Sequence, residues 1–425
     1  MFIYLILALF SVLNLILCQI HPVNSKEFTQ YILLWLGLAA LVGFLSGSAS
    51  AIFLVSLDWA TNFREANIWL IAFLPLAGFG IGYTYHHYGA NSVKGNNLLL
   101  DELYQSKNPI PLRMTPLVLF GTIFTHLFGG SAGREGTAVQ MGGSLADQLT
   151  KWFSLNPENR RLIIICGVAG GFASVFGTPL AGAIFSLEWM MTRKFRWKSI
   201  FPAFLTAFIA HWICELAWGV GHTQYSIPEI PIHSLVNLAW VIPAGIAFGL
   251  SGRLFAETGH VVSDIFKKIS YPPFRPLIGG LFVALIVYFS GTTTYIGLGV
   301  PRIVEAFEVP LPWYDWLVKT GLTGLTLGSG FKGGEVTPLF FTGATLGNAL
   351  SAWIPLPLAL LAGMGFVGVF SGATNTPMAC TVMGMELFGY QAGIFLGIAC
   401  LVAYIFSGKG TIYTSQNLGW KEKLP

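Results

Sequence analysis

The chain carries the same pattern of glycines, leucines and acids twice, and this repetition constrains its fold more than any other feature of the sequence. One block matches a later block at an offset of 201 residues, through Gly129, Gly133, Gly142, Leu145 and Leu149, which fall on Gly330, Gly334, Gly343, Leu346 and Leu350. A second block matches at an offset of 198 residues, through Gly167, Gly170, Phe172, Thr178, Pro179, Ala181 and Glu188, which fall on Gly365, Gly368, Phe370, Thr376, Pro377, Ala379 and Glu386. Agreement in two blocks, in the same order, predicts an internal duplication.

Each half of the duplication contains a glycine-rich loop with an acid in it. The first loop runs over residues 129–137 and includes Glu135, and the second runs over residues 328–338 and includes Glu335. A carboxylate at bilayer depth costs roughly 3 kcal/mol or more and usually marks an ion or proton pathway. Glycines let bare backbone N–H groups approach a small ligand, and a helix N-terminus adds a dipole that favours an anion. The two loops therefore indicate an anion site that the chain builds twice.

The composition predicts a polytopic helical membrane protein. Hydrophobic residues make up 54% of the chain and charged residues only 10%, whereas a soluble chain carries about 25% charged residues. The formal net charge of +4 comes mostly from short basic clusters at the ends of apolar runs, which are typical of cytoplasmic topology signals rather than of a nucleic-acid site. The five cysteines contain no CxxC pair, so neither a disulfide framework, nor a metal site, nor a cofactor is expected.

Several apolar runs are shorter than the roughly 20 residues that a perpendicular membrane span requires. Short, glycine-interrupted runs in matching halves predict broken helices that meet near the middle of the membrane, a pattern found in transporters. We expect an N-terminal helix over residues 1–28, a first membrane repeat over 29–222, a linker over 223–234, a second repeat over 235–408 and a short tail over 409–425. No soluble regulatory or nucleotide-binding domain is expected, so the energy would come from ion gradients or from the substrate's own gradient.

Four motifs give the chain a resemblance to the CLC family of anion channels and anion/proton antiporters over about residues 29–415. They are the Gly-Arg-Glu-Gly segment at 133–136, the Pro-Leu-Ala-Gly segment at 179–182 that leads to Glu188, the loop ending at Pro338, and Tyr413. The resemblance implies an all-α fold of two inverted-topology repeats with broken helices. It also implies a homodimer with one independent pathway in each subunit.

Three departures from the usual family pattern resemble the fluoride/proton antiporter branch. Thr137 replaces a proline after the Gly-Arg-Glu-Gly segment, residues 94–98 replace the usual pore segment, and residues 334–338 read Gly-Glu-Val-Thr-Pro. The resemblance therefore implies export of fluoride in exchange for protons across a bacterial cytoplasmic membrane. A passive anion channel and a chloride/proton exchanger are the alternatives. An intramembrane enzyme is not expected, because the chain contains no HExxH signature.

The resemblance assigns gating and proton transfer to Glu135. A carboxylate is a tethered anion that competes with a free anion for helix N-termini, and protonation removes its charge. The alternative for this residue is a structural ion pair with Arg134. The expected anion-binding residues are Asn96, Gly133, Arg134, Gly136, Val336, Thr337 and Tyr413.

Fluoride is compact and strongly hydrated, so a dry site must replace water with short donors such as the amide of Asn96 and the hydroxyl of Thr337. Asn96 has a helix cap or turn as its alternative reading. An ungapped count back from Glu135 places Lys94 at the pore position instead. Glu335 is a possible second acid, or else a partner of Lys332 or a helix N-terminal acid. Tyr413 is a pathway residue, or else an interfacial anchor.

Two further acids, Glu188 and Glu386, occupy equivalent repeat positions, which favours a structural role for both. Many family antiporters carry a proton-relay glutamate one residue after Glu188, where this chain has Trp189. Because tryptophan is only an N–H donor, the proton is expected to use the anion pathway itself, through groups such as Thr337, Glu335 and Tyr413.

Overall fold

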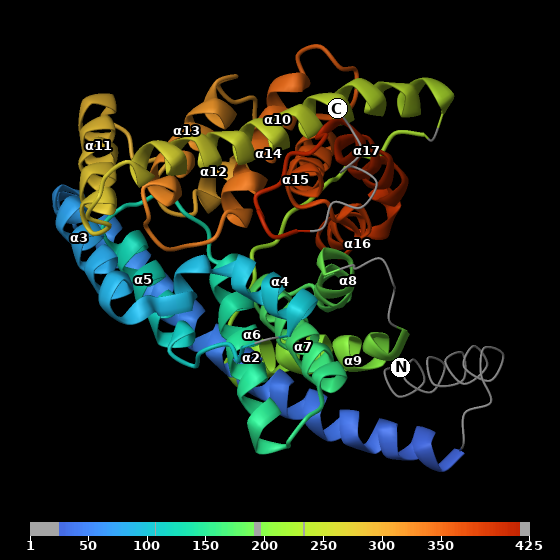
Figure 1. Cartoon of the computed structure of the whole chain (residues 1–425). Coiled ribbons are helices and arrows are strands. Elements are labelled where there is room, and N and C mark those ends of the chain that lie inside the picture. The colour runs from blue at the N-terminus through green and yellow to red at the C-terminus, as the bar shows by residue number, and fades with distance from the viewer. Residues whose placement is uncertain (1–24, 107, 191–196, 233, 417–425) are drawn as a thin grey trace.

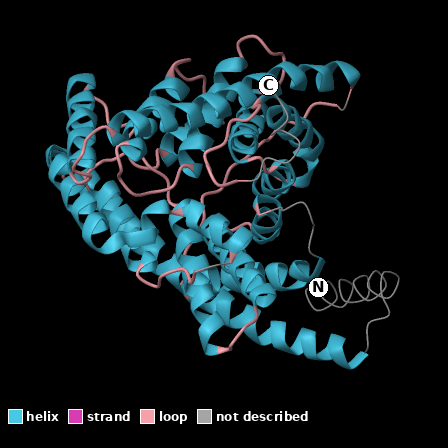
Figure 2. Cartoon of the chain, in the orientation of Figure 1, coloured by secondary structure: helices cyan, strands magenta, loops and turns pink. Residues whose placement is uncertain are grey.

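The computed structural model describes residues 25–106, 108–190, 197–232 and 234–416, and over these ranges the chain is helical without any β-strand (Figure 2). Five helical segments are long and apolar enough to cross a membrane, namely Thr29–Ala66, Ile68–Lys94, Pro157–Phe176, Trp197–Ala217 and Leu235–Lys267. Several of the other apolar helices have only 10–17 residues. The mixture of long and short helices agrees with the broken-helix pattern of the sequence.

The α-helices before the linker are α2 (Ser25–Ala66), α3 (Leu74–Thr84), α4 (Asn96–Gln105), α5 (Met114–Leu127), α6 (Glu135–Trp152), α7 (Pro157–Phe176), α8 (Pro179–Trp189) and α9 (Ile200–Trp212). The α-helices after it are α10 (Leu235–Lys267), α11 (Phe274–Ser290), α12 (Val300–Glu305), α13 (Asp315–Gly328), α14 (Val336–Leu350), α15 (Leu358–Thr374), α16 (Pro377–Phe388) and α17 (Gly393–Phe406). Short 3-10 segments η1 (Ile68–Phe73), η3 (Ala90–Lys94), η4 (Trp197–Ser199) and η6 (Tyr390–Ala392), and π-helical segments η2 (Tyr85–Gly89) and η5 (Ile213–Ala217), connect them.

The two halves of the chain form two stacked groups of helices. In Figure 1 helices α2 to α9, coloured blue to green, occupy the lower part and the left of the view, and helices α10 to α17, coloured yellow-green to red, occupy most of the upper part. Most of the expected N-terminal helix over residues 1–28 lies outside the described residues, and the first described helix, α2, begins at Ser25.

Paired glycines bring the helices of each half into backbone contact. A Cβ atom added to Gly142 in α6 would lie 2.2 Å from the carbonyl oxygen of Gly167 in α7. The matching Cβ on Gly343 in α14 would lie 2.1 Å from the carbonyl oxygen of Gly365 in α15. Both distances are far below van der Waals contact, so only glycine permits either crossing. The same crossing in both halves explains why these glycines recur at the offsets of 201 and 198 residues.

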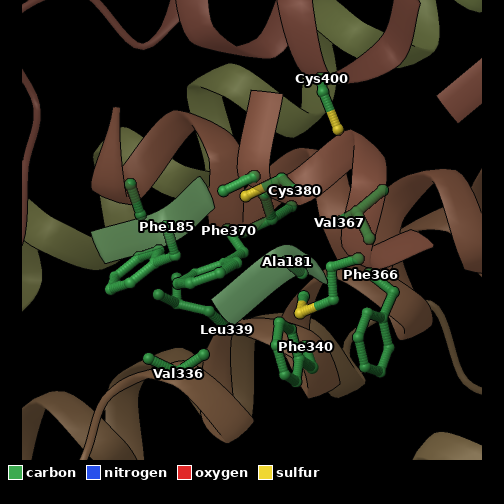
Figure 3. Close-up of a cluster of buried hydrophobic side chains, with 14 of the residues drawn as sticks. Ala181, Phe185, Val336, Leu339, Phe340, Phe366, Val367, Phe370, Cys380 and Cys400 are labelled. Atoms are coloured by element: carbon green, nitrogen blue, oxygen red, sulfur yellow. The ribbon is translucent and has the colours of Figure 1, made fainter. Parts of the chain in front are cut away.

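Aromatic side chains from both halves fill the space between them. Figure 3 shows Phe185 of α8 near Phe370 of α15, with Phe340 and Phe366 close by. The ring centroids of Phe340 and Phe366 lie 3.9 Å apart, and those of Phe185 and Phe370 lie 6.0 Å apart. Each aromatic pair adds about 0.5–1.5 kcal/mol to the stabilisation from apolar burial.

A reciprocal pair of helix caps also joins the halves. The carboxylate of Glu188 at the end of α8 accepts hydrogen bonds from the backbone N–H groups of Met378 (3.0 Å) and Ala379 (2.7 Å) in α16. The carboxylate of Glu386 in α16 accepts from Leu180 (2.9 Å) and Ala181 (2.8 Å) in α8. Each acid thus satisfies two orphan donors of the opposite helix. This geometry supports the structural role expected from their symmetry.

Candidate functional site

The two glycine-rich loops meet and pair with each other. The N–H of Gly133 donates to the carbonyl of Gly334 at 2.6 Å, and the N–H of Gly334 donates back to Gly133 at 2.8 Å, as an isolated antiparallel bridge. A Cβ atom on Gly133 would lie 2.9 Å from the Gly334 carbonyl oxygen, so a larger residue would push the loops apart. The bridge brings the N-termini of α6 and α14 to one place.

Glu135 is the first residue of α6, yet its side chain reaches the N-terminus of α14. Its carboxylate is buried, with 1% of the residue exposed. Oε2 accepts from the backbone N–H groups of Thr337 (3.0 Å) and Arg134 (3.1 Å), and Oε1 accepts from the Thr337 hydroxyl (2.5 Å). The carboxylate therefore accepts hydrogen bonds from donors that the sequence analysis predicted to bind a free anion.

The guanidinium of Arg134 lies beside this carboxylate without a hydrogen bond to it. The Nε atom of Arg134 lies 3.7 Å from Glu135 Oε1, and it is buried without a hydrogen-bond partner among the described residues. Arg134 lines a cavity of about 680 Å³ together with Arg64, Arg302 and Glu305, which we call the Arg134 cavity. The ion pair with Arg134, which was the alternative reading of Glu135, is thus present at 3.7 Å.

A second cavity of about 150 Å³ lies next to the second glycine-rich loop, and we call it the Asn96 cavity. The residues that line it include Tyr85, Lys94, Asn96, Gln140, Lys332, Glu335 and Tyr413. Glu335, which lines the Asn96 cavity, immediately precedes the α14 N-terminus that holds the Glu135 carboxylate. Arg134, which lines the Arg134 cavity, immediately precedes Glu135 in the chain. The contact between Glu135 and Thr337 therefore lies between the two cavities.

Asn96 is the first residue of α4 and makes no side-chain capping bond. It is 8% exposed, and its Oδ1 atom has no partner in the part of the chain that the structure describes. Its Nδ2 atom lies 3.0 Å from the place where a Cβ of Gly136 would be, so Gly136 makes room for the amide. The Oε2 atom of Glu335 is also buried without a partner in the described ranges. Because Asn96 makes no side-chain capping bond at the start of α4, its helix-cap reading is wrong.

Lys94 lines the same cavity but uses its ammonium elsewhere. Its Nζ atom lies 2.8 Å from Asp101 Oδ2, and 56% of its side chain is exposed. The structure thus places the Asn96 amide, rather than the Lys94 ammonium, against Gly136. Such an exposed ion pair contributes little to stability.

Tyr413 lines the Asn96 cavity and is 4% exposed. Its ring packs edge-on against Trp189, with the centroids 5.0 Å apart. Trp189 is 1% exposed. Val336, which begins α14, is also buried. The structure therefore brings Asn96, Glu335 and Tyr413 to one cavity, with Trp189 behind Tyr413.

Sequence reasoning missed Gln140 as a polar residue of this cavity. Gln140 lies one helical turn after Gly136, and the spacing i, i+4 on one helix face could have found it. Lys332 does not pair with Glu335 within 4.0 Å in the described ranges. Its Nζ atom lies instead 4.2 Å from the ring centroid of Tyr85. No sequence signal connects residues 85 and 332, because only the packing of η2 against the second loop brings them together.

Comparison with known proteins identifies the family. The sequence profile of the voltage gated chloride channel family matches residues 77–408. The chain belongs to the CLC family. Its members are channels and transporters rather than enzymes, and the helical architecture described above is that of CLC transporters.

Three proteins of this family are similar to the chain over most of its length. A chloride/fluoride channel protein of Pseudomonas syringae pathovar tomato is 51% identical over 403 residues, which cover 93% of this chain and 89% of the relative. The crystal structure of a CLC-type fluoride/proton antiporter is 37% identical, with a TM-score of 0.88, and the match covers 93% of this chain and 99% of that one. A slow cyanobacterial Cl⁻/H⁺ antiporter shares the fold, with a TM-score of 0.77 and 22% identity over 88% of this chain and 94% of that one.

Proposed function

We propose that this CLC protein is a fluoride/proton antiporter that exports fluoride across a bacterial cytoplasmic membrane. The observation that carries the proposal is the Glu135 carboxylate held by the N–H and the hydroxyl of Thr337. A fluoride ion needs the same donors, so carboxylate and fluoride compete for one place. Protonation of Glu135 would remove its charge and release the donors to fluoride.

The donors around this place suit a small anion. The Thr337 hydroxyl and N–H lie on one side, and the Asn96 amide faces the Asn96 cavity beside Gly136. Backbone groups of Arg134, Gly136 and Val336 complete the two converging helix N-termini, and Gly133 holds the two loops together through its bridge with Gly334. Fluoride would exchange its hydration for these short donors in a site with little water.

The proton is proposed to share the anion pathway on the Asn96 side. Trp189 is buried and offers only an N–H. Glu335 lies beside the anion path, and its Oε2 atom has no hydrogen-bond partner in the described ranges. The Tyr413 phenol lines the same cavity. These two groups are the proposed carriers between the cavity and Glu135.

The decisive experiment measures fluoride and proton flux together in proteoliposomes that contain purified protein. A fluoride gradient should drive protons uphill, and Glu135→Gln should abolish this coupling because an amide cannot exchange a proton. Full fluoride-driven proton pumping in Glu135→Gln would refute the assignment of Glu135. Fluoride flux without proton movement in the wild type would establish a channel, and chloride-driven pumping of equal strength would establish a chloride/proton exchanger.

We propose in addition that the protein is a homodimer. Helices α16 and α17 expose apolar side chains, among them Met378 (65% exposed), Ile394 (52%) and Leu401 (53%), and α8 lies against α16 through the reciprocal caps. Such a face requires cover by lipid or by a second copy. Light scattering of the purified protein should give twice the mass of the chain, and the mass of one chain would contradict the dimer.

A further inference from the structure

Helices α3 and α5 are at the left of Figure 1. An apolar groove lies between them. Its volume is about 520 Å³, and its lining includes Leu76, Ile81, Tyr85, Phe120 and Phe124. No Asp, Glu, Lys or Arg is among the described residues that line it. The hydroxyl of Thr84, which also lines the groove, already donates to the carbonyl of Gly80 at 2.8 Å. The groove therefore offers hydrocarbon surface with almost no unsatisfied polarity.

The surroundings of the groove are those of a lipid-facing surface. The segment Ile68–Lys94 has a mean hydropathy of 1.5 over its most apolar window, of which only 33% is buried inside the protein. At the rim, Leu76 is 63% exposed and Phe120 is 58% exposed. A cavity of roughly 150 Å³ is large enough to bind benzene, so this groove has room for a considerably longer alkyl segment.

Tyr85 separates the groove from the Asn96 cavity and lines both of them. The residue is 6% exposed, and the Nζ atom of Lys332 lies 4.2 Å from its ring centroid. Gly121 of α5 packs closely against both residues, because a Cβ there would lie 3.0 Å from Cβ of Lys332 and 3.5 Å from the Tyr85 ring. The Tyr85 ring therefore lies next to both Lys332 and α5.

The backbone connects Tyr85 to the cavity by a second route. Tyr85 opens the π-helical segment η2, which is followed by Ala90 with a φ of 43°. The 3-10 segment η3 then leads through Gly95 to Asn96. A π-helical turn and a non-glycine residue at positive φ are both unfavourable local geometries that need support from packing. The support for this segment includes the groove face of Tyr85.

We propose that the groove binds one lipid acyl chain, which packs against Tyr85 and holds this wall of the Asn96 cavity in place. A hydrocarbon tail is the occupant because the lining is apolar and uncharged and the groove opens toward the bilayer. The Tyr85 ring then lies between the Lys332 ammonium on the cavity side and the acyl chain on the lipid side. The shape of the lipid tail consequently affects anion flux. The proposal does not depend on whether that flux is coupled to protons or which halide is carried.

Occupancy of the groove is tested by photocrosslinking. The probe is phosphatidylcholine with a diazirine in its acyl chain, reconstituted with the full-length protein, and labelled peptides are mapped by mass spectrometry. Gly80→Leu fills the groove, since a Cβ on Gly80 meets no atom within 4 Å. Gly37→Leu is the matched control, because Gly37 of α2 is equally open and exposed. Ala77→Leu is a second groove-filling variant in case Gly80→Leu does not fold.

Labelling of α3 and α5 should exceed that of other exposed helices in the wild type and in Gly37→Leu. In Gly80→Leu it should fall by about threefold, which corresponds to about 0.7 kcal/mol. Even labelling along all exposed helices, or unchanged labelling of α3 and α5 in both groove-filling variants, would overturn the site.

The link to the cavity is tested by anion flux in two lipids, one with straight acyl chains and one with methyl-branched chains too wide for the groove. Flux through the wild type and Gly37→Leu should be slower in the branched lipid. In Gly80→Leu the leucine side chain fills the groove in either lipid, so the anion flux of this variant should be the same in both lipids. An equal response of all three proteins would refute the link, because it would reflect the bilayer as a whole.

Discussion

Under the proposed mechanism the Thr337 hydroxyl donates a hydrogen bond to two anions in turn, first to the Glu135 carboxylate and then to fluoride. This shared donor leads to a quantitative prediction. It donates to Glu135 Oε1 at 2.5 Å, in a place where fluoride is proposed to bind once the carboxylate leaves. A hydrogen bond to a charged group contributes about 1.5–3 kcal/mol. Replacing Thr337 by valine preserves the shape of the side chain but removes the donor, so both anions lose this contribution.

The apparent fluoride affinity of the wild type reflects a competition, because fluoride must displace the carboxylate. Thr337→Val weakens both competitors and should therefore change this apparent affinity only slightly. In the Glu135→Ala background no carboxylate competes. There, Thr337→Val should weaken fluoride binding by the full 1.5–3 kcal/mol, or about 10- to 150-fold.

The assay is calorimetric titration of fluoride into the four purified proteins of this double-mutant cycle. Thr337→Ser is the control, because it keeps the hydroxyl and loses only a methyl group. It should bind fluoride nearly as well as threonine in the Glu135→Ala background. Equal losses from Thr337→Val in both backgrounds, or no loss without the carboxylate, would show that the two anions do not share this donor.

Three further predictions concern the cavity and the helix crossings. Trp189→Phe should leave the fluoride-to-proton flux ratio intact, whereas Glu335→Gln should lower proton coupling; the opposite pair of results would refute the proposed proton route. Asn96→Ala should lower the ratio of fluoride to chloride binding, by about 1–3 kcal/mol for a lost donor in a buried site, and an unchanged ratio with intact transport would place selectivity elsewhere. Gly142→Ala should lower stability by about 1–3 kcal/mol through overpacking, because its Cβ would lie 2.2 Å from a backbone carbonyl. Thermal unfolding in detergent measures this loss, and Gly37→Ala, which meets no atom within 4 Å, should show none of it.

Much of the fold could be predicted from the sequence because its determinants are local or periodic. Apolar composition requires helices with satisfied backbone groups in a membrane, and the two offsets identify the duplication. The loop around Glu135 could be located because an acid among glycines and apolar residues is unusual. The matched acids Glu188 and Glu386 were correctly expected to be structural, since both halves contain them at equivalent positions.

The sequence by itself determined the membrane class, the repeated helices and the identity of the central acid. Only the tertiary structure decided which groups this acid meets, because its partner Thr337 lies 202 residues away and its donors come from the opposite half. The same holds for Lys332, which contacts Tyr85 rather than Glu335, and for Asn96, whose position depends on the space left by Gly136. These contacts depend on how helices from the two halves cross, and the spacing of residues along either half does not specify that crossing.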